Sequence, residues 1–230
     1  MSTSTLAKKI IAFNRELQLD TRLPDGITVM NPFESKTTRK LSEDFYTKFY
    51  DDHHPRVMLL GINPGRFGAG VTGIPFTDPI RLKQKCGISN DLNKKPELSS
   101  QFVYQMIDAF GGVDDFYSRF LVSAVSPLGF LKDGKNINYY DLKSLQNTVE
   151  PFILNTMKQQ LNFGVSTKTA ICLGEGKNYK YLTKINREYH FFDEIVPLSH
   201  PRYIMQYKRK QLNSYIRRYL DVLEKATSAD

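Results

Sequence analysis

Cysteine is scarce in this sequence, and the scarcity excludes several kinds of protein and site. Only Cys86 and Cys172 are present among 230 residues, and they lie far apart. Two cysteines cannot form a disulfide framework, and they are too few to ligate a structural zinc ion or an iron–sulfur cluster. The composition therefore favours a reducing compartment, and we expect a protein without a metal or another cofactor.

Histidine is also sparse, and its spacing does not suit a metal site. His53 and His54 are adjacent, while His190 and His200 lack the i, i+4 helical spacing with an intervening carboxylate that zinc hydrolases use. We expect none of the four histidines to bind a metal ion.

Long apolar runs are missing as well. No run approaches the roughly 18 residues of a membrane-spanning helix, and residues 1–17 carry a basic pair without the apolar region or cleavage site of a secretory signal. The chain also lacks repeats, low-complexity blocks and linkers longer than an ordinary loop. We expect a cytoplasmic monomer with no membrane partner. It should form one domain, residues 1–230, in which residues 1–50 are a helical extension packed on the rest.

The charge balance is basic, with 32 Lys and Arg against 24 Asp and Glu and a sequence pI near 9.3. This excess suits a polyanionic partner such as DNA. It does not establish one, because basic proteins without a nucleic-acid role are common.

The order of apolar segments predicts an α/β fold. Four short apolar runs, bounded by Gly or Pro, are typical of buried strands, and segments with helical periodicity alternate with them. Strand, crossover and strand in succession indicate a mainly parallel sheet covered by helices on both faces, with ligands beyond the carboxyl ends of the strands. The predicted strands are 57–62, 120–125, 170–174 and 194–199, and the predicted helices are 6–17, 41–50, 101–112, 141–162 and 207–224.

Two familiar site patterns fit the sequence poorly. Residues 68–73, GAGVTG, match the dinucleotide-binding pattern, but they do not follow a strand directly, and Pro75 comes at once after them. Ser199 precedes His200, but no nucleophile elbow is present, and neighbours on an extended chain point to opposite faces. A nucleotide-cofactor enzyme and a serine hydrolase therefore remain minor alternatives.

A third pattern combines Asn63 and His200, which we expect to face each other across adjacent strand ends. An asparagine amide can hold a water molecule, and an imidazole N–H can donate to a developing oxyanion. Together these groups suit hydrolysis of a bond with an anionic leaving group. The alternative for each residue is structural: Asn63 caps a turn, and His200 satisfies a backbone carbonyl.

The motifs around these two residues resemble those of a known family. LLGINPGRFGAGVTGIPF, residues 59–76, is similar to the first active-site motif of the uracil-DNA glycosylase superfamily, most closely the single-strand-selective monofunctional uracil-DNA glycosylases. LSHPRY, residues 198–203, resembles the second motif, and DGKNI, residues 133–137, falls where the family has a loop. The resemblance extends over about residues 55–222. It implies a three-layer α-β-α fold with a central four-stranded, mainly parallel sheet.

The resemblance also implies an activity and assigns residues to it. The family extrudes a damaged base from DNA and hydrolyses its N-glycosidic bond without a metal or cofactor. On this template Asn63 positions the attacking water and His200 donates to O2 of the departing base. Phe76 stacks on the base, and Gly65 leaves room for it. The other residues that line the base pocket on this template are Gly61, Ile62, Phe67, Ser123 and Ala124.

Basic and aromatic residues near the motifs are the expected DNA contacts, although a solvated helix face is an equally common role for any one cation. We expect Arg66, Arg202 and Lys208 to contact phosphates. The segment after His200 is shorter than the family's usual loop, so Arg202, Tyr203 and Ile204 must fill the space that the extruded base vacates. A short wedge favours single-stranded or mispaired DNA, where extrusion costs less.

One residue departs from the family pattern. Ala124 stands where the family has an asparagine that reads uracil. Either Ser123, Ser126 or a backbone group compensates for the missing amide, or the pocket also accepts xanthine or hypoxanthine. The alternative function is a catalytically weak protein of the same fold that binds damaged DNA.

Overall fold

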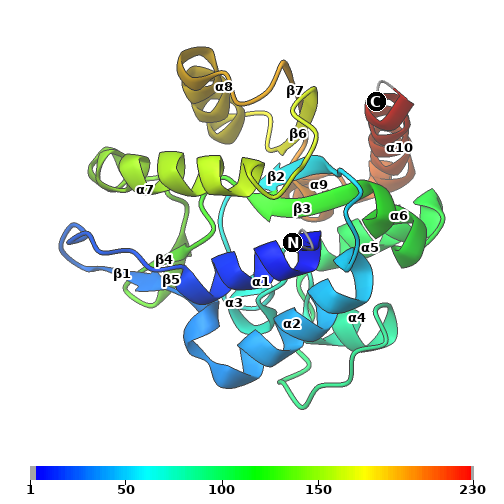
Figure 1. Cartoon of the computed structure of the whole chain (residues 1–230), viewed down its shortest axis with the longest axis horizontal. Helices are drawn as coiled ribbons and strands as arrows, with labels where there is room; N and C mark the ends of the chain where they lie inside the picture. Colours follow the sequence, from blue (N-terminus) through cyan, green and yellow to red (C-terminus); the bar gives the residue numbers. More distant parts are fainter. Residues whose placement is uncertain (1–3, 229–230) are drawn as a thin grey trace.

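A parallel four-stranded sheet forms the centre of the molecule (Figure 1). The computed structural model describes residues 4–228; residues 1–3 and 229–230, which the sequence assigns to the same domain, lie outside the described part. The strand order is β3-β2-β6-β7, and all three pairings are parallel. The strands agree with the predicted runs to within one residue and confirm the α/β fold: β2 (Val57–Gly61), β3 (Phe120–Ala124), β6 (Thr169–Leu173) and β7 (Glu194–Leu198).

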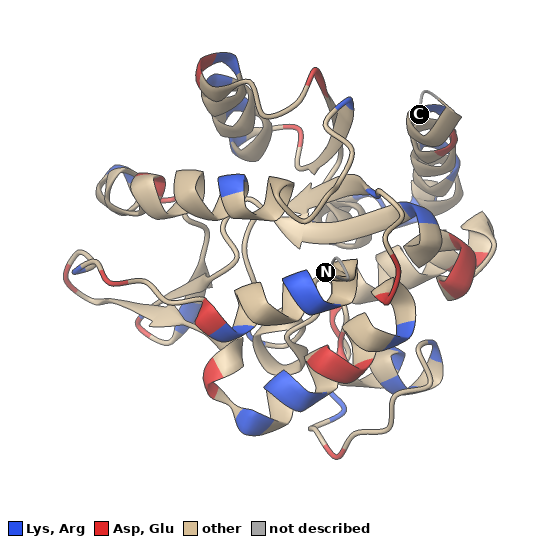
Figure 2. Ribbon diagram, viewed as in Figure 1, with Lys and Arg blue, Asp and Glu red and all other residues tan. Residues whose placement is uncertain are grey.

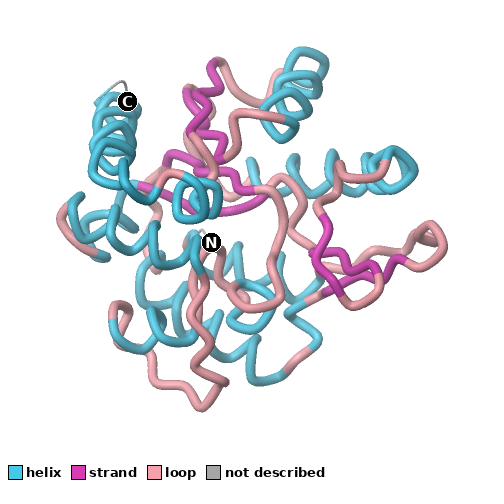
Figure 3. Tube along the Cα trace, turned by 180° about the vertical axis from the view of Figure 1, so that it is seen from behind, coloured by secondary structure: helices cyan, strands magenta, loops and turns pink. Residues whose placement is uncertain are grey.

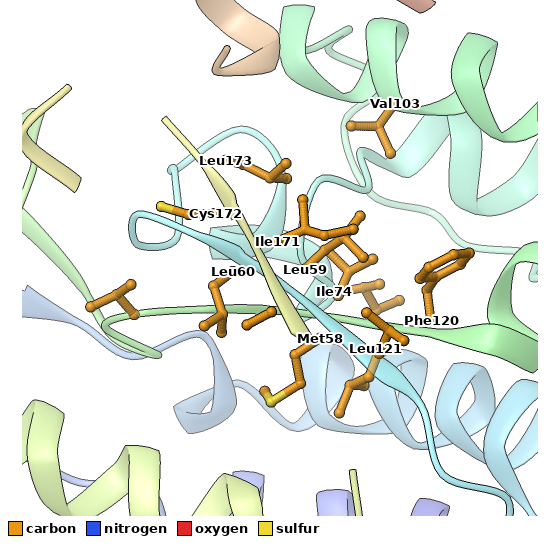
Figure 4. Close-up of a cluster of buried hydrophobic side chains, with 14 of the residues drawn as sticks. Met58, Leu59, Leu60, Ile74, Val103, Phe120, Leu121, Ile171, Cys172 and Leu173 are labelled. Carbon is orange, nitrogen blue, oxygen red and sulfur yellow. The ribbon is translucent and has the colours of Figure 1, made fainter. Parts of the chain in front are cut away.

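The two middle strands are apolar on both faces because helices cover both. Every residue of β2 and β6 is buried, as expected for parallel strands inside a helical shell. Met58, Leu59 and Ile171 lie in this buried cluster, together with Phe120 and Leu121 of β3 (Figure 4).

Most of the helices begin or end at recognisable signals. Ser35 caps α2 by accepting from the Thr38 N–H, and Asp78 caps α4 by accepting from Ile80 and Arg81. Gly111 ends α5 at a φ of 130°. The helices are α1 (Leu6–Glu16), α2 (Lys36–Tyr50), α3 (Ala69–Thr72), α4 (Pro79–Gln84), α5 (Leu98–Phe110), α6 (Val113–Arg119), α7 (Lys143–Leu161), α8 (Lys177–Tyr189), α9 (Pro201–Tyr207) and α10 (Leu212–Ser228), with the 3₁₀ turns η1 (Pro32–Glu34) and η2 (Arg209–Gln211).

The N-terminal segment contributes to the core. Leu6 and Ile10 of α1 are buried in the same cluster as the sheet residues, and α1 packs against α2. The Lys9 ammonium donates to the Phe163 carbonyl at 2.9 Å, and the rings of Phe13 and Phe163 meet edge to face at 5.3 Å. These contacts join α1 to the end of α7.

The predicted helix over 207–224 is wrong at its start. Helix α9 ends at Tyr207, η2 follows, and α10 begins only at Leu212. The two helices bury separate apolar sets, Ile204 with Met205 and Tyr219 with Leu223. The residues between the two helices are mostly basic and none of η2 is buried, so the chain turns there.

A second sheet was not predicted. Strands β1 (Ile27–Met30), β4 (Gly129–Lys132) and β5 (Lys135–Ile137) pair antiparallel in the order β1-β4-β5, apart from the central sheet (Figure 3). Asp133 and Gly134 join β4 to β5 with φ of 50° and 68°, which suits the two-residue hairpin turn that Asp-Gly favours. Strands of three or four residues are too short to show a clear alternation.

The charges are mixed rather than gathered by sign: basic and acidic segments alternate along α2 (Figure 2). Within residues 4–228, no helix has the length and apolar character to cross a membrane. The same residues contain no cluster of three or more His, Cys, Asp or Glu side chains suited to a metal ion.

Candidate active site

A cavity of about 620 Å³ opens at the carboxyl ends of the central strands. The loop after β2, the end of β3, helix α9 and the segment around β5 contribute to its wall. Lys208 does not line it and lies beyond α9. All the other predicted site residues do: Gly61, Ile62, Asn63, Gly65, Arg66, Phe67, Phe76, Ser123, Ala124, His200, Arg202 and Tyr203.

The Asn63 amide is held by backbone groups of a distant segment. Its Oδ1 accepts from the Tyr139 N–H at 3.1 Å, and its Nδ2 donates to the Ile137 carbonyl at 3.3 Å and, more loosely, to that of Pro64 at 3.4 Å. These bonds fix the amide oxygen in one orientation. Because a carbonyl oxygen has two lone pairs, Oδ1 can accept one more hydrogen bond from the cavity.

His200 is the N-cap of α9, and this role determines its tautomer. Its Nδ1 accepts from the Arg202 N–H at 3.2 Å, so Nδ1 carries no proton and Nε2 carries one. The structural alternative, a bond to a backbone carbonyl, is thus replaced by a bond from a backbone N–H. Burial, and to a smaller extent the nearby Arg202 charge, lowers the pKa of His200 to about 4. At neutral pH the side chain is an uncharged Nε2–H donor.

Asn63 and His200 do not follow adjacent strands, contrary to the sequence prediction, because β6 lies between β2 and β7. The Gly174 N–H donates to the Leu198 carbonyl at 2.7 Å, which continues the pairing of β6 with β7 past Leu173, and Gly174 has a φ of 136°. Asn63, which follows β2, and His200, which follows β7, nevertheless line the same cavity.

Phe76 occupies a strained backbone position beside His200. It is the third residue of the turn 74–77, closed by the Thr77 N–H on the Ile74 carbonyl at 3.2 Å, and its φ is 53°. Glycine or asparagine usually fills such a position. The ring lies 5.7 Å from the imidazole of His200, between centroids, and rests on Gly61, where an added Cβ would come within 2.8 Å of Phe76 Cε2.

Gly65 leaves space open in the cavity. A Cβ at Gly65 would meet only the Asn136 amide, at 4.0 Å, so a side chain there would project into the cavity.

Two cations lie over the ring of Phe67, which lines the cavity. The Arg66 guanidinium and the Lys95 ammonium lie over the Phe67 ring at 4.7 and 4.0 Å from its centroid. Arg66 also donates to the Gly134 carbonyl at 2.6 Å.

The segment after His200 is helix α9 rather than a loop. Arg202 forms an ion pair with Glu97 at 3.6 Å, and Tyr203 is 44% exposed at the mouth. Ile204 is fully buried in the core, so the prediction that it helps to fill the vacated space is wrong. Tyr207, 68% exposed, packs against Tyr203 with ring centroids 5.5 Å apart.

Sequence reasoning missed several residues of this cavity. Tyr139 holds Asn63 through its backbone, which no side-chain pattern could reveal. Asn136 and Asn138 belong to a polar segment of the sequence, but their position in the cavity depends on the small antiparallel sheet, which was not predicted. The missed lining residues include Glu97, Asn136, Asn138, Gln206 and Tyr207.

Both serines that were expected to compensate for Ala124 already donate their hydroxyl protons to other groups of the protein. The Ser123 hydroxyl donates to Gln160 Oε1, and the Ser126 hydroxyl donates to the Leu128 carbonyl at 2.9 Å. Ala124 also lines the cavity, and its side chain is only a methyl group.

The chain is similar to a known protein family and to a solved structure. A model of the Uracil DNA glycosylase superfamily matches residues 47–224. The crystal structure of wild-type SMUG2 from Pedobacter heparinus is similar over 98% of this chain and 100% of that chain, with 46% sequence identity and a TM-score of 0.96. Among curated protein sequences, none matches the chain.

Proposed function

The chain belongs to the uracil DNA glycosylase superfamily and is a DNA glycosylase, and we propose that it hydrolyses the N-glycosidic bond of uracil with Asn63 and His200 as its catalytic residues. The observation that carries this proposal is the meeting of an oriented amide oxygen and a neutral imidazole N–H in one cavity, beside an aromatic ring.

Asn63 holds the attacking water. The backbone bonds from Tyr139 and to Ile137 fix Oδ1, whose remaining lone pair accepts from the water and directs its oxygen toward C1′ of the sugar. An asparagine cannot take up the water's proton as an aspartate can. Cleavage of the C1′–N1 bond therefore precedes water attack, and a sugar cation forms first.

His200 stabilises the leaving group. As C1′–N1 breaks, the bonding electrons move into the base, and the Nε2–H donates to O2, where negative charge collects. Water then adds to C1′ and loses one proton to solvent, the uracil anion takes up a proton from solvent, and free uracil and an abasic site remain. A fixed donor of this kind typically contributes about 2.7–4 kcal/mol to transition-state stabilisation.

The base reaches the cavity by leaving the DNA stack, and Phe76 receives it. Stacking of a base on an aromatic ring contributes about 1–3 kcal/mol and does not depend on which base it is. This gain offsets the backbone strain at Phe76. Gly65 leaves the adjoining space free. Because Ala124 has no side-chain amide to select uracil over a purine, we extend the proposal to xanthine and hypoxanthine.

Arg66, Arg202 and Lys208 are the proposed phosphate contacts, with Tyr203 and Tyr207 stacking at the site that the base leaves. The short helix α9 offers no long wedge, which favours single-stranded or mispaired DNA. We propose that the protein acts as a cytoplasmic monomer.

A test of this proposal measures free base from a single-stranded oligonucleotide that contains one uracil. Wild-type protein and Asn155→Ala, a variant of an exposed asparagine on α7, are expected to release uracil and leave an alkali-labile site. Asn63→Ala is expected to release it much more slowly. Absence of free uracil at enzyme excess contradicts the proposal, and retention of lesion DNA without base release favours the damage-binding alternative.

A further inference from the structure

A second, smaller cavity lies behind the proposed base pocket. Its volume is about 40 Å³, and its wall comes from α1, α2, β3 and α7. Ser123 and Ala124 line both cavities, as do Pro64, Ala69 and Pro75. The small side chain of Ala124 thus stands between the two spaces.

Two buried amides face this inner cavity with donors to spare. Gln160 is 1% exposed and Asn14 is 9% exposed. Neither Gln160 Nε2 nor Asn14 Nδ2 has a hydrogen-bond partner within residues 4–228. An unpaired buried donor destabilises the fold, and buried polar groups in native proteins are normally satisfied by protein or by ordered water.

Ser123 contacts the carbonyl end of the Gln160 amide. Its hydroxyl donates to Gln160 Oε1, and the Nε2–H₂ group at the other end remains a donor. A cavity needs about 10–15 Å³ to hold one water molecule. The inner cavity of about 40 Å³ is therefore large enough for a water relay beside Ala124.

Resting on the proposed function, we propose that Gln160 determines base specificity: through water beside Ala124, its Nε2–H donates to the carbonyl oxygen on the base edge that His200 does not contact. For uracil this oxygen is O4. Cytosine carries an amino group there, which is itself a donor and cannot accept this bond. Gln160 thus replaces the missing side-chain amide at position 124 from a different element, α7.

The test compares uracil with 2-pyrimidinone, a base that lacks the 4-oxo group. Single-turnover release is measured from single-stranded oligonucleotides for wild type, Gln160→Met and Gln159→Met. Gln159 is the exposed neighbour on α7 and serves as the matched control. The intrinsic difference between the two leaving groups is the same for every variant and cancels when the rate ratios are compared.

We expect wild type and Gln159→Met to show equal uracil-to-pyrimidinone ratios and Gln160→Met to lower the ratio by about fivefold or more, the loss of one buried hydrogen bond. Ser123→Ala, which frees the Gln160 amide to turn, lowers it in the same direction and carries the test if Gln160→Met does not fold. In an Ala124→Asn background, Gln160→Met changes the ratio little, because the new amide reads the base directly.

An unchanged ratio in folded Gln160→Met and in Ser123→Ala overturns this inference and leaves the glycosylase activity standing. Failure of both wild type and Gln159→Met to release uracil overturns the proposed function and this inference with it.

Discussion

Tyr139 donates its backbone N–H to Asn63 Oδ1 at 3.1 Å, across 76 positions of sequence. The bond joins the end of the β4–β5 hairpin to the loop after β2, so the small antiparallel sheet orients the proposed catalytic amide. The Tyr139 hydroxyl donates in turn to Asn178 Oδ1 at 2.8 Å, which anchors this segment to α8. The amide is therefore oriented by backbone groups that are themselves fixed.

The rate of uracil release should not fall between pH 8 and pH 5. In the proposed mechanism His200 acts as the neutral imidazole. Burial and the Arg202 charge lower its pKa to about 4, so acidification to pH 5 leaves most of it neutral. The measurement is single-turnover release across this range. A rate that halves near pH 6.5, the ordinary pKa of histidine at about 6.5, contradicts this environment for His200.

Because of His200, the protein should become less stable as the pH falls, whereas a histidine in a salt bridge would make it more stable. The folded pKa of about 4 lies below the unfolded value of about 6.5, so between these values the unfolded chain binds the proton more tightly. The free energy of unfolding should be constant above about pH 6.5 and decrease as the pH falls toward 4. Urea unfolding of wild type and His200→Asn measures this, and the variant should lose that part of the slope. His190→Asn, at an exposed histidine, should keep it.

Phe76→Gly should separate function from stability. Glycine adopts the φ of 53° without strain, which offsets part of the lost packing, so Tm should change little. Binding to uracil-containing DNA should weaken by about 5- to 150-fold, the loss of one base–ring stack of about 1–3 kcal/mol. His190→Gly is the matched control, since His190 has a φ of 51° and is exposed. Equal DNA affinity in Phe76→Gly and wild type would show that this ring does not receive the base.

Glu97→Gln should strengthen DNA binding. Glu97 pairs with Arg202 at 3.6 Å at the mouth of the cavity, and removing its charge frees the guanidinium for a phosphate. Glutamine can still accept from the Ser100 N–H, so the cap of α5 is kept. Fluorescence titration at several salt concentrations should show tighter binding and a salt slope steeper by up to about one. Asp108→Asn, which breaks an exposed pair with Lys85, should change neither quantity.

The sequence predicted the parts of this protein that have long, strong patterns. The four central strands could be located because they are continuous apolar runs, and Asn63 and His200 because they follow two of them. Ser123, by contrast, was expected to face the base, and only the packing of α7 shows that its hydroxyl is engaged by Gln160. The β5 hairpin and the bond from Gly174 to Leu198 depend on non-local pairing, which no local pattern contains. The ion pair between Arg202 and Glu97 could not be predicted either, because the two residues lie far apart in the sequence.

If Asn63 and His200 act together on one base, the loss of either side chain must slow the single-turnover release of free uracil. We expect His200→Ala and Asn63→Ala each to slow release by about 100-fold or more, and the double variant to be less than additively slower, while Asn155→Ala and His190→Ala match wild type. Wild-type rates in both folded single variants would show that these two residues do not catalyse the reaction.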